Sequence, residues 1–175
     1  KEIFYDNLGR QTKSTKIIEG SGSFTIEYAY DAADRITSLT YPDKAVVTYA
    51  YNKFGQIESI SNGASLLVRD IYYSPTQQIT NISYANNTTS RYMYNPNTLR
   101  ISNIFTQSPY KKIQDLRYFF DNTGNVKDIQ DFVNNSTQSF LYDDLNRLVN
   151  ASGSYGAFSY DYDSIGNIIH KEGMN

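Results

Sequence analysis

The chain has 175 residues and a formal net charge of −2, from 16 Lys and Arg against 18 Asp and Glu. No run of Lys or Arg stands out, so a nucleic-acid-binding protein is not expected, and the absence of cysteine excludes disulfides and thiolate chemistry. Aromatic residues make up 15% of the chain, with 17 Tyr, 9 Phe and no Trp. We therefore expect aromatic rings to supply much of the core.

One motif recurs along the whole chain: an aromatic residue, then Asp, Asn or Ser, two variable positions, Gly or another turn residue, a polar residue and usually an aliphatic one. In chain order its copies begin at Tyr5, Tyr30, Tyr51, Tyr73, Tyr94, Phe120, Tyr142 and Tyr162. The intervals range from 20 residues (Tyr142 to Tyr162) to 26 residues (Tyr94 to Phe120). Such a period indicates a repeat architecture, so we predict a single array of about eight repeats over residues 1–175.

Each repeat is predicted to be a β-hairpin. Before the motif, aromatic residues alternate with others, as at Tyr28 and Tyr30, which is typical of a strand with one aromatic face. The Asp, Asn or Ser that follows favours the first position of a type I turn. The fourth turn position holds residues that tolerate positive φ, which predicts a bulge after the turn. These residues are Gly9, Asp34, Gly55, Gly124, Asn146 and Gly166.

Two turns depart from this pattern. Gln77 occupies the fourth turn position of the fourth copy, and the fifth copy has an extra residue before Arg100. We expect these two turns to be the least regular.

The strand after each turn carries aliphatic residues three positions apart, as at Ile36 and Leu39. In a regular strand this spacing places the pair on opposite faces, so either both faces are partly covered or a bulge intervenes. Residues that break regular structure, such as Asn62 and Gly63, then lead into the next hairpin. The expected fold is therefore all-β, with tandem β-hairpins in a continuous curved or spiralling antiparallel sheet. A β-propeller is the alternative, since two repeats have the length of one four-stranded blade.

The motif Tyr-Asp-x-x-Gly-Arg followed by an aliphatic residue resembles the YD-repeat, or Rhs, family. It is clearest at Asp6 with Arg10, at Asp31 with Arg35 and at Asp143 with Arg147. The family includes bacterial Rhs and wall-associated toxins, the B and C components of insecticidal toxin complexes, and the teneurins. The resemblance implies a segment of a hollow β-shell, which in bacterial members encloses a C-terminal toxin. It also implies a secreted or cell-surface location, with neighbouring repeats and an enclosed toxin domain as partners.

Three features of the sequence concern the extent, targeting and processing of the chain. It begins inside a repeat and ends soon after one, so we expect it to be a piece of a longer array. No signal peptide and no apolar run long enough to span a membrane is present. We also find no match to the Pro- and Asp-containing segment with which bacterial members close the shell and cut off the toxin.

The motif residues are expected to have a structural role. The carboxylates are interpreted as turn caps, because Asn and Ser replace Asp at the same place, and the Arg is interpreted as a partner for that carboxylate across the turn. The predicted structural set is Tyr5, Asp6, Gly9, Arg10, Tyr30, Asp31, Arg35, Tyr51, Asn52, Gly55, Phe120, Asp121, Gly124, Tyr142, Asp143, Arg147, Tyr162, Asp163 and Gly166.

No catalytic residue, metal site or cofactor is predicted. His170 is the only histidine, which excludes a multi-histidine metal site. Asp143 with Asp144, or Asp161 with Asp163, has the residue types of a glycosidase pair. Asp161 and Asp163 alternate along a strand beside Tyr160 and Tyr162, so charges on an exposed face explain them better.

Two functions remain. The first is a non-catalytic scaffold whose cut sheet edges would pair with another chain or self-associate. The second is a carbohydrate- or cell-surface-binding module in which exposed tyrosine rings stack on a saccharide. Rings packed between hairpins would favour the scaffold, and rings on the face away from the aliphatic residues would favour binding.

Overall fold

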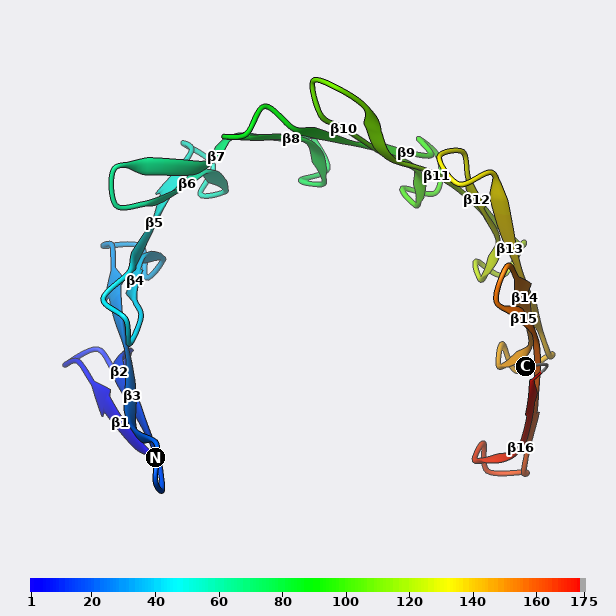
Figure 1. Ribbon diagram of the computed structural model, residues 1–175, viewed down its shortest axis with the longest axis horizontal. Helices are drawn as coiled ribbons and strands as arrows, with labels where there is room; N and C mark the ends of the chain where they lie inside the picture. Colours follow the sequence, from blue (N-terminus) through cyan, green and yellow to red (C-terminus); the bar gives the residue numbers. More distant parts are fainter. Residues whose placement is uncertain (174–175) are drawn as a thin grey trace. The chain divides into compact units, whose positions relative to one another are not determined.

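The computed structural model describes residues 1–173, which consist of strands and the turns that join them (Figure 1). The described residues fall into two units, residues 1–87 and residues 88–173. The prediction of an all-β chain is confirmed.

Unit 1 contains eight strands, and each pairs antiparallel with the next strand in the sequence. They are β1 (Glu2–Tyr5), β2 (Gln11–Ile18), β3 (Gly22–Tyr30), β4 (Ile36–Thr40), β5 (Val46–Tyr51), β6 (Ile57–Asn62), β7 (Ser65–Tyr73) and β8 (Ile79–Tyr84). The pairing of β4 with β5 makes one sheet of these strands, whereas a propeller would divide them into two four-stranded blades.

Unit 2 repeats this arrangement with eight further strands. They are β9 (Thr89–Tyr94), β10 (Ile101–Gln107), β11 (Lys112–Phe120), β12 (Val126–Asp131), β13 (Ser136–Tyr142), β14 (Leu148–Gly153), β15 (Gly156–Tyr162) and β16 (Ile168–Gly173). Here β12 pairs with β13, so the same argument excludes two separate blades. Each unit is an open antiparallel sheet that curves along its length (Figure 1).

The motif turns have the geometry that their sequence predicts. In the first copy, the backbone N–H of Gly9 donates to Asp6 O over 3.0 Å and the N–H of Asp6 donates to Arg10 O over 2.9 Å. Gly9 has a φ of 78°, and the register shifts by one residue between Phe4 and Tyr5. A type I turn followed by a residue of positive φ and a bulge is a common hairpin connection.

The expectation that the fourth turn is irregular was wrong. Gln77 has a φ of 65°, its N–H donates to Ser74 O over 2.9 Å, and the N–H of Ser74 donates to Gln78 O over 2.8 Å. The flanking strands impose the same backbone path as in the other copies, and Gln77 adopts the left-handed conformation in spite of its Cβ. The fifth turn does differ, because Leu99 N bonds to Asn95 O four residues earlier and Leu99 has a φ of 57°.

The bulge determines on which face of the sheet the aliphatic residues lie. Tyr30 is opposite Ile36 and Tyr28 is opposite Leu39, so the extra residue, Thr37, brings both aliphatic side chains to the aromatic face. The same shift occurs in the other hairpins, for instance where Phe120 is opposite Val126 and Tyr118 is opposite Ile129. Because of the bulge, two aliphatic residues that are three positions apart lie on the same face of the sheet, and each hairpin has one apolar face.

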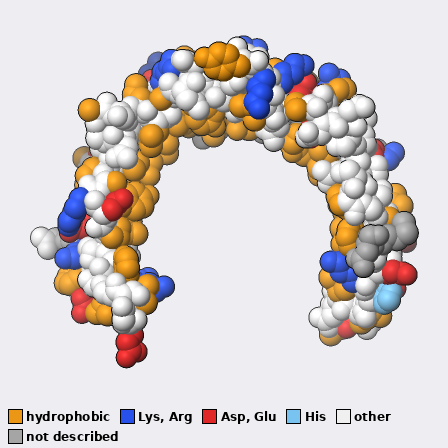
Figure 2. Space-filling view, in the orientation of Figure 1, with side chains coloured by type: hydrophobic (Ala, Val, Ile, Leu, Met, Phe, Trp, Pro, Cys, Tyr) orange, Lys and Arg blue, Asp and Glu red, His pale blue; other side chains and the backbone are white. Residues whose placement is uncertain are grey.

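This apolar face is the core of each unit, and it is shallow. Among residues 1–173, Ala151 is the only buried apolar residue, with 6% of its surface exposed. Most motif aromatics are half-buried, covered by their neighbours in the same layer. Hydrophobic side chains gather on the inner side of the bend within each unit (Figure 2).

The strain at Gln77 makes a prediction about stability. Replacing Gln77 with Gly should raise the free energy of unfolding by about 0.5–1 kcal/mol, because glycine adopts positive φ without a Cβ penalty. The measurement is urea denaturation followed by circular dichroism. Lys53→Gly is the control, since Lys53 is an exposed turn residue without positive φ and should lose stability. Destabilisation by both changes would contradict the assignment of strain to Gln77.

Candidate functional site

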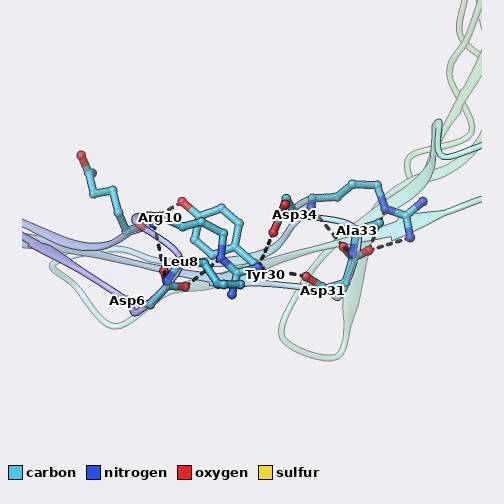
Figure 3. Close-up of polar contacts among 9 residues, drawn as sticks. Asp6, Leu8, Arg10, Tyr30, Asp31, Ala33 and Asp34 are labelled. Atoms are coloured by element: carbon cyan, nitrogen blue, oxygen red, sulfur yellow. Dashed lines mark hydrogen bonds and ion pairs between the residues drawn. The ribbon is translucent and has the colours of Figure 1, made fainter.

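The site that the repeat creates is the contact between one motif turn and the next. Its first element is the capped turn. In the first copy, Asp6 Oδ1 accepts the N–H groups of Leu8 and Arg10, both at 2.9 Å, while Asp6 Oδ2 accepts Arg10 Nε at 2.7 Å (Figure 3). Asp31 with Arg35 and Asp143 with Arg147 repeat this arrangement. These bonds are the ones that a turn cap and a local ion pair require.

Copies without the Asp–Arg pair keep the cap. Asn52 Oδ1 accepts the N–H groups of Phe54 and Gln56, and Asn52 Nδ2 donates to Gln56 Oε1 over 3.1 Å. Asp121 and Asp163 make the same backbone bonds, with Asn in place of Arg as the side-chain donor. The cap is therefore common to these copies, whereas the ion pair is optional.

Capping favours the ionised carboxylates. Hydrogen bonds from Arg10 lower the pKa of Asp6, and those from Arg35 lower the pKa of Asp31. The hydroxyl of Thr123, together with the donors of Asn125 and Gly124, lowers the pKa of Asp121 to about 2.

The second element is a tyrosine hydroxyl that joins neighbouring repeats. Tyr51 Oη donates to Ile36 O over 2.6 Å, and Ile36 is the first residue of the strand after the preceding motif turn. Four other copies make the equivalent bond: Tyr30 to Gln11 O, Tyr73 to Ile57 O, Tyr142 to Val126 O and Tyr162 to Leu148 O. Sequence analysis missed this bond. Seven of the eight motifs begin with Tyr and only one with Phe, and this preference is the signal, since packing alone would accept either ring.

The third element is the motif arginine, which reaches into the next repeat. Arg10 Cζ lies 4.9 Å from the centre of the Tyr30 ring, and Arg10 Nη1 donates to Asp31 O over 3.1 Å and to Asp34 Oδ1 over 2.7 Å (Figure 3). The interpretation of the arginine as a partner within its own turn was thus incomplete. It bonds its own Asp and also holds the following turn.

The same contact recurs in both units. The guanidinium of Arg35 lies 4.4 Å from the centre of the Tyr51 ring, that of Arg147 lies 4.6 Å from Tyr162, and that of Arg100 lies 5.6 Å from Phe120. These distances suit a cation–π interaction, worth about 0.5–1 kcal/mol at exposed sites.

The turn glycines make room for this arginine. A Cβ placed on Gly124 would collide with the Arg100 guanidinium, and one on Gly55 would lie 3.4 Å from Arg35 Nη1. Glycine at this position therefore permits positive φ and also lets the preceding arginine approach the turn.

Within residues 1–173, no three His, Asp or Glu side chains gather as metal ligands. The same residues include no helix that is long and apolar enough to cross a membrane.

The tyrosine bond makes a prediction at Phe120, the one motif ring without a hydroxyl. Phe120→Tyr should raise the free energy of unfolding by about 0.5–1.5 kcal/mol, because the new hydroxyl would meet the equivalent acceptor, Ile101 O. Tyr51→Phe should lower it by a similar amount. Both values come from thermal and urea denaturation. Two neutral substitutions would show that the hydroxyl contributes nothing beyond its ring.

The caps predict a loss of stability in acid. The folded-state pKa of Asp121 lies near 2, below its ordinary value of 3.8, so its contribution is present above about pH 4 and is lost as the pH falls through 2. Asp6, Asp31, Asp143 and Asp163 shift in the same direction. The melting temperature should therefore fall between pH 4 and pH 2. Asp121→Asn should weaken this dependence, because an amide caps the turn without titrating, and an unchanged acid slope would argue against the cap.

A comparison with protein-family models matches part of this chain. The RHS Repeat family model matches residues 30–65, which contain the second and third motifs. A search of curated protein sequences gives no significant match.

The fold is similar to that of several solved toxin structures. The crystal structure of TcdB2-TccC3-Cdc42 matches with a TM-score of 0.78 and 19% identity, over 97% of this chain and 11% of the other. TcdB2-TccC3 without its hypervariable C-terminal region gives 0.78 and 20%, over 94% and 11%. The Photorhabdus luminescens Tc holotoxin pore with a TccC3 mutation gives 0.76 and 21%, over 92% and 10%.

The chain spans about a tenth of the length of these solved chains, and at this level of identity the likeness concerns the fold. The match at residues 30–65 and the fold over nearly the whole length together confirm the resemblance of this chain to the YD-repeat, or Rhs, family.

Proposed function

We propose that the chain is a non-catalytic structural scaffold, a segment of the wall of a YD/Rhs shell that encloses or displays a C-terminal toxin or effector. The observation that carries the proposal is the single-layered sheet of each unit, which has one apolar face and almost no buried core. A domain that bound or catalysed on its own would bury that face against a second layer. A wall leaves the face open toward whatever it surrounds.

The motif residues fit this role better than they fit saccharide binding. The motif rings lie on the same face as the aliphatic residues, and the hydroxyls of Tyr30, Tyr51 and Tyr73 bond to neighbouring repeats. The hydroxyl of such a ring is bonded within the sheet and is therefore not available to donate to a saccharide.

The proposal extends to the organisation and partners of the chain. Residues 1–175 would form one repeat array within a longer protein, with further repeats pairing at its sheet edges. The enclosed partner would be a toxin or effector polypeptide, and the location would be outside the producing cell, as the toxin neighbours suggest.

Site-specific photo-cross-linking in the parent protein tests which face meets the enclosed polypeptide. Benzoylphenylalanine in place of Tyr49, on the apolar face, should cross-link to a segment outside the repeats. The same group in place of Ala50, which is adjacent and on the opposite face, should not. Mass spectrometry identifies the product. Cross-links from position 50 alone, or from neither position, would count against an enclosing wall.

A further inference from the structure

One boundary in unit 1 lacks its arginine and has a pocket in its place. The third motif carries Gln56 where the first two carry Arg10 and Arg35. A pocket of about 400 Å³ lies at this boundary, lined by Gln56 and by Tyr73, the first motif residue of the next repeat. The size is within the range of small-ligand sites.

At the preceding boundary, a guanidinium lies beside the ring that corresponds to Tyr73. The Arg35 guanidinium stacks there on the ring of Tyr51. Tyr73 is the equivalent of Tyr51, since its hydroxyl makes the equivalent bond to Ile57 O. Within residues 1–173 no Lys or Arg lies over the Tyr73 ring. Gln56 is shorter and uncharged, and its side chain is bonded to Asn52.

The charges of the pocket select a cation. Glu58 and Asp70 line it, no Lys or Arg does, and in the described part of the chain neither carboxylate forms an ion pair or a side-chain hydrogen bond. Pockets at two boundaries of unit 2 differ, because Arg100 lines one and Lys127 lines the other. The pocket beside Gln56 is thus acidic where those two already contain a cation.

Two further rings complete the lining. Tyr72 is 57% exposed, so its ring is accessible to a ligand. Phe54 is 76% exposed, and Lys53 Nζ lies 5.0 Å from the centre of its ring, so a cation already covers one face of that ring. A guanidinium stacks on aromatic rings and donates to carboxylates through its planar fork, which an ammonium cannot do as well. A neutral saccharide would leave both carboxylates without a counter-charge.

We propose that this pocket binds the guanidinium group of an arginine side chain presented by another polypeptide. The arginine would take the place over Tyr73 that Arg35 takes over Tyr51, with Glu58 and Asp70 as its anionic partners. The wall would then carry a specific docking point for a basic segment, in addition to its role as a scaffold.

The test is an NMR titration of the 175-residue chain with the peptide acetyl-Gly-Arg-Gly-amide. Saturable shifts of the Phe54, Tyr72 and Tyr73 ring signals are expected. The same peptide with citrulline, which is neutral and nearly isosteric, should give none. Glu58→Gln and Asp70→Asn should each weaken binding about fivefold, the effect of losing one charge pair in contact at the surface. Equal binding of both peptides, or no binding of the arginine peptide, would overturn the proposal.

A matched pair of variants distinguishes binding in the pocket from a general effect of added positive charge. Gln56→Arg should fill the pocket from within, abolish peptide binding and raise the melting temperature. Asn125→Arg adds the same charge at a boundary in unit 2 and should leave peptide binding unchanged. The melting temperature of each variant confirms that it is folded. Undiminished binding to folded Gln56→Arg, or equal loss in both variants, would place the peptide elsewhere and refute the site.

Discussion

The one-residue bulge after each motif turn is the constraint on which the rest of the structure depends. It places an aromatic pair and an aliphatic pair, such as Tyr28 with Tyr30 and Ile36 with Leu39, on one face of the sheet. Without it, one aliphatic residue of each pair would point to the opposite face. The bulge in turn requires positive φ at the fourth turn position, which explains why Gly, Asn and Asp recur there.

Once the rings share one face, neighbouring repeats can join through side chains as well as through backbone pairing. The hydroxyl of Tyr51 reaches Ile36 O, and the guanidinium of Arg35 covers the same ring from the same preceding repeat. Each such contact contributes only about 0.5–1.5 kcal/mol. In a repeat array these nearest-neighbour terms add along the chain, and they compensate for a core in which almost nothing is fully buried.

Local chemistry in the sequence predicted the hairpins, the turn type and the caps, because each depends on residues within one motif. Contacts between motifs were harder to predict from the sequence. The spacing of Ile36 and Leu39 left two arrangements open, since only the register of the partner strand distinguishes them. The contact of Arg10 with the next turn depends on which turn lies beside it. Arg10 and Asp31 are 21 residues apart in the sequence, and only the pairing of β2 with β3 brings them together. The turn at Gln77 was predicted to be irregular because a residue with a Cβ adopts positive φ at a cost. The flanking strands nevertheless impose the regular turn, and Gln77 adopts positive φ.

Redundancy at each boundary explains why the motif can diverge without breaking the sheet. Between the third and fourth repeats, Gln56 replaces the arginine, yet the Tyr73 hydroxyl bond and the pairing of β6 with β7 remain. Between the sixth and seventh, Asn125 Nδ2 instead donates to Asn146 Oδ1 over 2.8 Å, a shorter link to the next turn. Loss of one side-chain contact therefore costs little stability and exposes an aromatic ring beside a turn. A scaffold built in this way can acquire a binding site at one boundary while the others continue to hold the wall together.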